Sequence, residues 1–124
     1  MRVLKNRAFA RFARKADLGD AALCKVIEDL KRGLIGADLG GGVIKQRVAR
    51  SGEGKSGGFR VLILYRRKDR AVFVHGFAKN EKPNISPDEL SAPKELASEV
   101  LNYDYRAIEV AIAAGVFTEV ICLG

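Results

Sequence analysis

The centre of the chain holds three strand-like runs of residues, and their spacing limits the folds that the chain can adopt. The runs are Val43–Ala49, Phe59–Arg66 and Ala71–Ala78. The link Arg67–Arg70 between the second and third runs is short enough for a hairpin, so these strands should be antiparallel neighbours. The first link, Arg50–Gly58, holds four glycines and suits a loop whose backbone approaches a ligand. The centre therefore predicts a small antiparallel β-sheet.

Helical patterns precede this sheet. Apolar residues at helical spacing predict one helix over Asn6–Ala16 and a second helix that ends at Gly33. The segment Asp17–Asp20 interrupts the pattern between them and offers an N-cap. Two short amphipathic helices joined by a tight turn predict a helical hairpin. Met1–Leu4, before the first helix, is compatible with a short edge strand.

Further helices are predicted after the sheet. Ser86–Glu89 has the residues of a capping box, and Pro93 either kinks the helix that follows or restarts it. Asp104 should cap another helix, and Val116–Leu123 is typical of a terminal strand. The predicted fold class is therefore α+β, with an N-terminal helical hairpin packed on a small antiparallel β-sheet and followed by C-terminal helices. Residues 1–91 are predicted to form the main domain, and residues 92–124 an acidic helical appendage of the same domain.

The positive charge of the chain is concentrated on this sheet. Val43–Lys82 contains eleven Lys or Arg and three Asp or Glu, whereas the whole chain has a net charge of +7. The remainder of the chain is therefore close to neutral. A packed sheet does not require such an excess of cations, but a surface that binds phosphates does.

The sequence lacks the residues that several other classes of enzyme require. The sequence has no Ser-His-Asp candidate set, no H-E-x-x-H motif and no G-K-[ST] after the glycine-rich segment Leu39–Gly42. A single histidine and scattered carboxylates predict neither a metal site nor a cofactor. Cys24 and Cys122 lie far apart, outside any C-x-x-C motif, so we expect both to be reduced in a cytoplasmic protein. No apolar run reaches about 18 residues, so no contact with a membrane is predicted.

Four basic residues of the predicted sheet are candidates for catalysis. Lys45 and Arg47 are two positions apart and should share one face of the sheet. Arg60 opens the second strand, and Lys79 ends the third. If the strands pair as predicted, the four side chains converge on one patch. Such cations suit RNA cleavage by a ribose 2′-OH, since Arg donates to phosphate oxygens and a Lys crowded by cations can act as a base. Passive nucleic-acid binding is the alternative.

The order of these elements resembles a known family. Two helices are followed by Gly41–Ala49 (GGVIKQRVA), then Gly52–Arg60 (GEGKSGGFR), then Gly76–Glu81 (GFAKNE). Together these segments resemble the RelE/HigB-like toxins of type II toxin–antitoxin systems, over about Met1–Ser91. The resemblance implies a compact α+β fold and an mRNA endonuclease that cuts within the ribosomal A site without a metal. It also implies a cognate antitoxin as partner, and contact with operator DNA only through the toxin–antitoxin complex.

The resemblance assigns roles to particular residues. Lys45 and Arg47 match the two basic positions that the family uses as base and phosphate ligand. Arg60 matches an arginine that stabilises charge in the transition state, and Lys79 matches the lysine at the end of the third strand. Asn80 stands where some members have an arginine, and no residue matches the downstream tyrosine of other members, so the general acid is unassigned.

RNA contacts are predicted for residues around these four: Arg50, Lys55, His75 and Asn80. His75 shares strand parity with Phe73 and Phe77, which favours a core or rim position for it. Two other functions remain open. One is a gyrase poison of the ParE type, which has the same fold but usually lacks the basic set. The other is a non-enzymatic DNA-binding corepressor that acts with an antitoxin.

Overall fold

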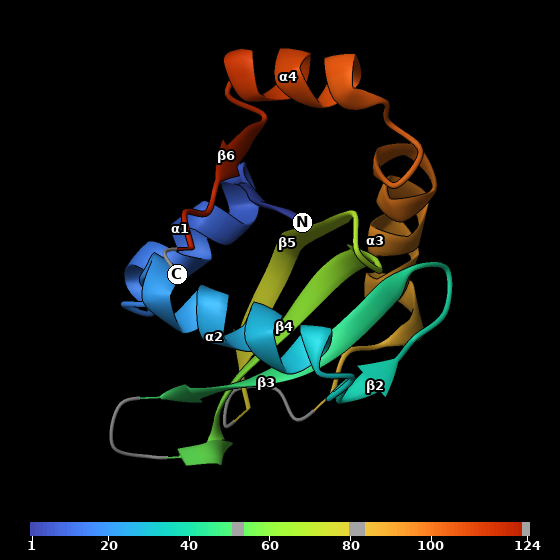
Figure 1. Cartoon of the computed structure of the whole chain (residues 1–124). Coiled ribbons are helices and arrows are strands. Elements are labelled where there is room, and N and C mark those ends of the chain that lie inside the picture. Colours follow the sequence, from blue (N-terminus) through green and yellow to red (C-terminus); the bar gives the residue numbers. More distant parts are fainter. Residues whose placement is uncertain (51–53, 80–83, 123–124) are drawn as a thin grey trace.

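A computed structural model describes residues 1–50, 54–79 and 84–122. Its helices and strands alternate along the chain (Figure 1). In chain order they are β1 (Arg2–Asn6), α1 (Arg7–Lys15), α2 (Asp20–Lys31), β2 (Ala37–Asp38), β3 (Val43–Arg50), β4 (Gly54–Arg66), β5 (Arg70–Ala78), α3 (Pro87–Val100), α4 (Tyr105–Ala113) and β6 (Phe117–Glu119).

The strands form one mixed sheet in the order β2-β3-β4-β5-β1-β6. β3, β4 and β5 are antiparallel neighbours, as their spacing predicted. The parallel pairing of β1 with β5, in the register Arg2↔Arg70, was not predicted, and β6 then pairs antiparallel with β1. The N-terminal strand therefore lies inside the sheet, not at its edge. Local pattern does not indicate this position, because both partners of β1 lie far along the chain.

The predicted N-terminal helical hairpin on an antiparallel sheet is wrong. The chain begins with a strand, and its helices lie between β1 and β2 and in the C-terminal part. α1 packs against β1 and β5, whereas α2 packs against β3. Each helix buries its apolar side on a different part of the sheet, so the amphipathic pattern reflects packing on strands and not on a partner helix.

Hydrophobic residues fill both faces of the sheet. One buried cluster lies beneath α1 and α2 and includes Phe9, Leu23, Ile63 and Phe73. A second cluster lies beneath α3 and α4 and includes Leu62, Val72, Val100 and Ile108. Figure 1 shows α2 in front of the sheet and α3 behind it. The fold is therefore a sheet covered on both faces, with β4 and β5 contributing side chains to both clusters.

Two predicted helix starts are confirmed. Ser86 caps α3 in a capping box with Glu89, and Pro93 lies inside a continuous helix. Asp104 caps α4 by accepting a hydrogen bond from the backbone N–H of Ala107 at 2.8 Å. The expected N-cap of α2 is different, since Gly19 occupies it and makes no side-chain bond there.

The expectation of reduced cysteines is also wrong. Cys24 of α2 and Cys122, which follows β6, form a disulfide with a Cα–Cα distance of 5.5 Å. The two residues are 98 positions apart, so only the tertiary fold brings them together. Within the described residues, no helix is long and apolar enough to cross a membrane.

A close approach of α1 to β5 requires the glycine at position 76. A Cβ there would overlap the ring of Phe12, which packs edge-on against Phe59 with ring centroids 5.5 Å apart. We expect Gly76→Ala to lower the free energy of unfolding by about 1–3 kcal/mol, because overpacking displaces this ring. Urea denaturation measures the change.

The matched control is the same substitution in a Phe12→Leu background. The smaller side chain removes the overlap, so Gly76→Ala should cost much less there. An equal cost in both backgrounds would show that the contact with Phe12 is not the cause.

Candidate functional site

The four predicted catalytic side chains line one cavity of about 330 Å³ at the end of the sheet. The lining residues are Gly36, Ala37, Lys45, Gln46, Arg47, Arg60, Lys79 and Asn84. Side chains or backbone from β2, β3, β4 and the end of β5 thus meet at a single concave surface. A pocket lined by four cations suits an anionic ligand.

Strand register explains why these cations meet. Arg47 lies directly opposite Arg60 across β3 and β4, and Phe77 of β5 lies opposite Arg60 on the other side. Residues opposite one another point to the same face of the sheet. On this face Lys45 is the partner of Leu62, which belongs to the buried cluster beneath α3. The cationic surface therefore begins where the apolar cluster ends.

The charged side chains differ in their exposure. Arg60 is only 5% exposed, whereas Arg47 and Lys79 are exposed and Lys45 is half-buried. Burial, and then the positive charge of Arg47, lower the pKa of Arg60. An arginine stays protonated at neutral pH even so, so a buried positive charge faces the cavity. A bound phosphate would offset both the desolvation and the repulsion, and would raise this pKa again.

Gln46 positions the edge of the cavity and was not among the predicted site residues. Its side-chain amide donates to the Leu34 carbonyl at 3.0 Å and accepts from the Gly36 backbone N–H. The residue is 5% exposed. It thus ties the segment before β2 to β3, next to the cations. In the sequence, Gln46 lies between Ile44 and Val48, which face the core. A polar residue at such a position indicates a buried side chain with hydrogen-bond partners.

Gln46→Leu is expected to lower the free energy of unfolding by about 1–3 kcal/mol, because it removes the two hydrogen bonds that the buried Gln46 amide makes to the backbone of Leu34 and Gly36. Thermal or urea unfolding measures this loss. The matched contrast is Arg47→Ala on the same strand, where an exposed side chain is removed and stability should change by less than about 0.5 kcal/mol. Equal stability of Gln46→Leu and the wild type would contradict this role.

His75 lies on the face of the candidate site. In the β4–β5 register Leu62 pairs with His75 and Ile63 pairs with Phe73, so Val74 is an extra residue in a bulge. Phe73 therefore belongs to the cluster beneath α1 and α2, whereas the His75 ring lies 5.9 Å from the Phe77 ring. The parity that linked His75 to both phenylalanines is broken by this bulge. His75 does not line the cavity, but it shares the face of Leu62.

The other predicted RNA contacts are placed only in part. The backbone of Arg50 ends β3 opposite Gly54, and the backbone of Lys55 lies in β4, but both side chains fall outside what the structure describes. Asn80 lies outside the described residues altogether. Asn84 lines the cavity although no sequence pattern indicated it. Within the described residues, no group of three or more His, Cys, Asp or Glu could hold a metal ion.

The family model of the RelE toxin of the RelE/RelB toxin–antitoxin system matches residues 1–120. The chain belongs to the RelE toxin family. The match includes every strand and helix described above, β6 among them. No curated protein sequence gives a significant match to this RelE toxin. As a member of the family it is the toxin of a toxin–antitoxin system, and its partner is an antitoxin.

Proposed function

We propose that this RelE toxin is a ribosome-dependent mRNA endonuclease whose active site is the cavity lined by Lys45, Arg47, Arg60 and Lys79. The convergence of these four cations on one concave surface carries the proposal. Their arrangement matches a reaction in which negative charge develops on a phosphate, because fixed donors around the phosphate then stabilise the transition state more than the substrate.

The proposed reaction is attack of a ribose 2′-oxygen on the adjacent phosphorus. A base removes the 2′-OH proton, the new P–O bond forms, and the bond to the 5′-oxygen of the next nucleotide breaks. That oxygen then takes up a proton, which leaves a 2′,3′-cyclic phosphate and a 5′-hydroxyl. We assign the proton acceptor to Lys45 and phosphate binding to Arg47 and Lys79, which lie at the more open side of the cavity.

Arg60 is assigned to the developing charge on the phosphate. Its burial fixes the guanidinium in place, and its planar donors match the geometry of two phosphate oxygens. A donor that is already positioned does not have to reorganise during the reaction. The exposed cations around it supply the attraction that draws RNA to the site.

The proposed partners follow from this chemistry. mRNA on the ribosome is the substrate, which implies action in the cytoplasm. The antitoxin is expected to cover the cationic surface with acidic side chains, since opposite charge steers such association. Operator DNA is expected to be bound only by the toxin–antitoxin complex.

Mapping of mRNA 5′ ends after induction without antitoxin tests the proposal. Wild-type toxin should produce new ends inside translated codons, and these should disappear with Arg60→Ala. Arg67→Ala is the matched control, because Arg67 is an exposed arginine in the turn at the other end of the β4–β5 hairpin. It should cut like the wild type.

Two results would contradict the proposal. Growth arrest without new mRNA ends would point to another target such as gyrase. Cleavage that continues in untranslated messages would remove the ribosome from the mechanism.

A further inference from the structure

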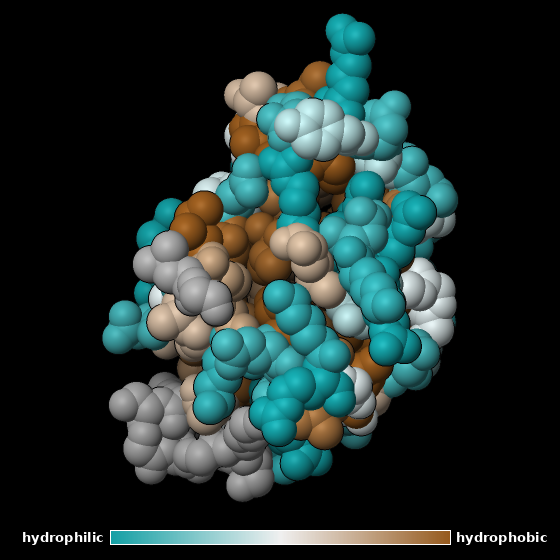
Figure 2. Space-filling model, viewed as in Figure 1, coloured by the Kyte–Doolittle hydropathy of each residue, from teal (hydrophilic) through white to brown (hydrophobic). Residues whose placement is uncertain are grey.

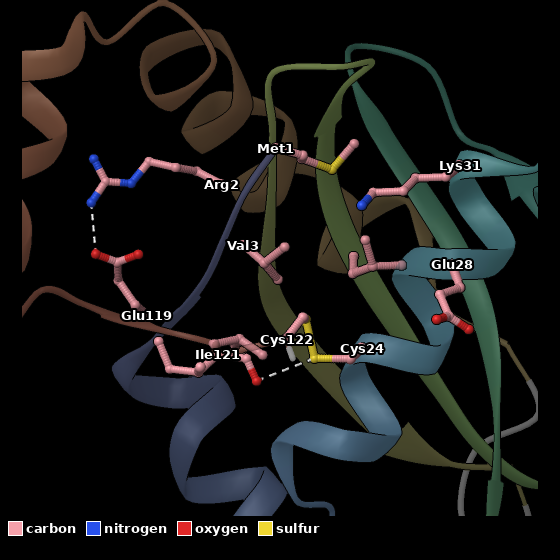
Figure 3. A pocket seen from close by; sticks show the side chains of 11 residues that line it. Met1, Arg2, Val3, Cys24, Glu28, Lys31, Glu119, Ile121 and Cys122 are labelled. Carbon is pink, nitrogen blue, oxygen red and sulfur yellow. Dashed lines mark hydrogen bonds and ion pairs between the residues drawn. A yellow bond between two sulfur atoms is a disulfide. The ribbon is translucent and has the colours of Figure 1, made fainter. Parts of the chain in front are cut away.

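The Cys24–Cys122 disulfide lies in a second cavity that has no part in the proposed RNA site. This cavity has a volume of about 340 Å³, and none of its lining residues lines the cationic cavity. α2, β1 and the segment after β6 form its walls. Figure 3 shows the two sulfur atoms between α2 and the C-terminal segment, with Ile121 beside them and Met1 at the far end of the cavity.

Both sulfur atoms belong to residues that solvent reaches. Cys122 is exposed and Cys24 is half-buried. Met1 and Ile121, which also line this cavity, are 40% and 60% exposed. Figure 2 shows hydrophobic side chains at the surface between α2 and α4, the region where this cavity opens. A small molecule can therefore reach the disulfide without unfolding of the chain.

An exposed disulfide is chemically different from a buried structural one. Disulfides that are open to solvent are the labile ones, since a thiolate can approach the sulfur in line with the bond. In compartments rich in glutathione, a disulfide that forms is usually transient and takes part in catalysis or redox sensing. A toxin that meets ribosomes would meet such a thiol pool.

We propose that Cys24–Cys122 is a thiol–disulfide exchange site for low-molecular-mass thiols, and that its redox state controls how firmly the C-terminal strand is anchored. A thiolate attacks Sγ of the exposed Cys122, the S–S bond breaks, and the electron pair leaves on Sγ of Cys24. A second thiol then attacks the sulfur of the first reagent molecule and releases Cys122 as a thiolate. Two thiols are oxidised to one disulfide, and the protein disulfide is reduced to two cysteines.

The reduced state has a place for the freed Cys24 thiol. Its sulfur lies 3.5 Å from the backbone oxygen of Ile121, which can accept a hydrogen bond from the thiol. While the C-terminal segment stays in place, the freed Cys24 thiol therefore keeps a hydrogen-bond acceptor. Reversal needs only the two sulfur atoms to meet again across the same cavity.

Besides the disulfide, a small number of contacts hold the last described residues. Arg2 bonds Glu119 at 2.7 Å, the Ile121 N–H donates to the Asp20 carboxylate at 3.2 Å, and Val120 is buried. β6 pairs with β1 over three positions, and the next backbone bond joins the Val120 N–H to the Val3 carbonyl at 2.9 Å. A short edge strand of this kind opens readily, because few hydrogen bonds must break together. The disulfide adds a covalent link from this strand to α2. Its loss should therefore increase local opening of β6.

Equilibration of the purified full-length chain in glutathione buffers tests the exchange step. After alkylation, mass spectrometry should show a graded conversion between the oxidised and the two-thiol forms as the ratio of reduced to oxidised glutathione is varied. The Cys24→Ser/Cys122→Ser variant is the control and should show no conversion. A wild-type chain that stays oxidised until denaturant is added would overturn the proposal, as would reduction by a protein dithiol but not by glutathione.

Hydrogen exchange tests the anchoring step. Reduction should accelerate amide exchange at Thr118 and Val120 by at least tenfold relative to the oxidised chain. Val61 and Ile63, in the centre of the sheet, provide the internal reference and should not change. Equal exchange of the C-terminal amides in both redox states would overturn this part. These readouts count thiols and amides, so they stand apart from any result on RNA cleavage.

Discussion

Arg60→Ala should lower the rate of mRNA cleavage by about 10²–10³-fold, the loss expected when one preorganised donor to a developing oxyanion is removed. The reason is its position, since this buried guanidinium lies opposite Arg47 and faces the cationic cavity. Single-turnover cleavage on programmed ribosomes measures the effect. Because the chemical step is followed directly, weaker binding of the ribosome does not obscure it.

Two further variants sharpen this test. Arg60→Lys keeps the charge but loses the planar pair of donors, so its rate should fall between those of the wild type and Arg60→Ala. Arg67→Ala, at the far turn of the hairpin, should leave the rate unchanged. Circular dichroism must show that each variant is folded, since Arg60 is buried. Wild-type cleavage by a folded Arg60→Ala protein would remove Arg60 from the mechanism.

The second large effect is on stability. Reduction of the disulfide, or Cys24→Ser with Cys122→Ser, should lower the free energy of unfolding by about 2–5 kcal/mol, because the link then no longer restricts the unfolded chain. The two cysteines are 98 residues apart, so the disulfide closes a long loop in the unfolded chain. The entropic stabilisation by a cross-link is greatest for long loops. Urea denaturation with and without dithiothreitol measures the difference.

The double serine variant provides the control for this measurement. It should unfold at the same urea concentration whether or not dithiothreitol is present, and close to the reduced wild type. If oxidised and reduced wild-type chains unfolded at one midpoint, the disulfide would contribute nothing to the folded state.

Local features of the fold were predictable because they depend on neighbouring residues. The capping box of α3, the Asp104 N-cap of α4 and the hairpin from β4 to β5 each need only a few adjacent positions. Sequence reasoning failed where partners are distant. The parallel pairing of β1 with β5 and the disulfide both join segments that the tertiary fold alone brings together.

In the candidate site, too, some features were predictable from neighbouring residues and others were not. Alternation along β3 placed Lys45 and Arg47 on one face, and the structure brings them to one cavity with Arg60 and Lys79. The bulge at Val74 was invisible in the sequence, so the parity of His75 was misread. Gln46 was overlooked because a polar residue in a basic strand looks like one more surface position, although its amide holds the Gly36 segment.

The place of β1 in the sheet has a consequence for the order of events during synthesis. β1 is the first strand to leave the ribosome, but its two neighbours are β5 and β6, which are made much later. The sheet cannot be completed while β6 is still inside the ribosome, because β6 is the strand that pairs with the free edge of β1. A newly made toxin would thus complete this sheet only after β6 has left the ribosome's exit tunnel. An antitoxin produced nearby would have that interval in which to meet a chain that is still unfinished.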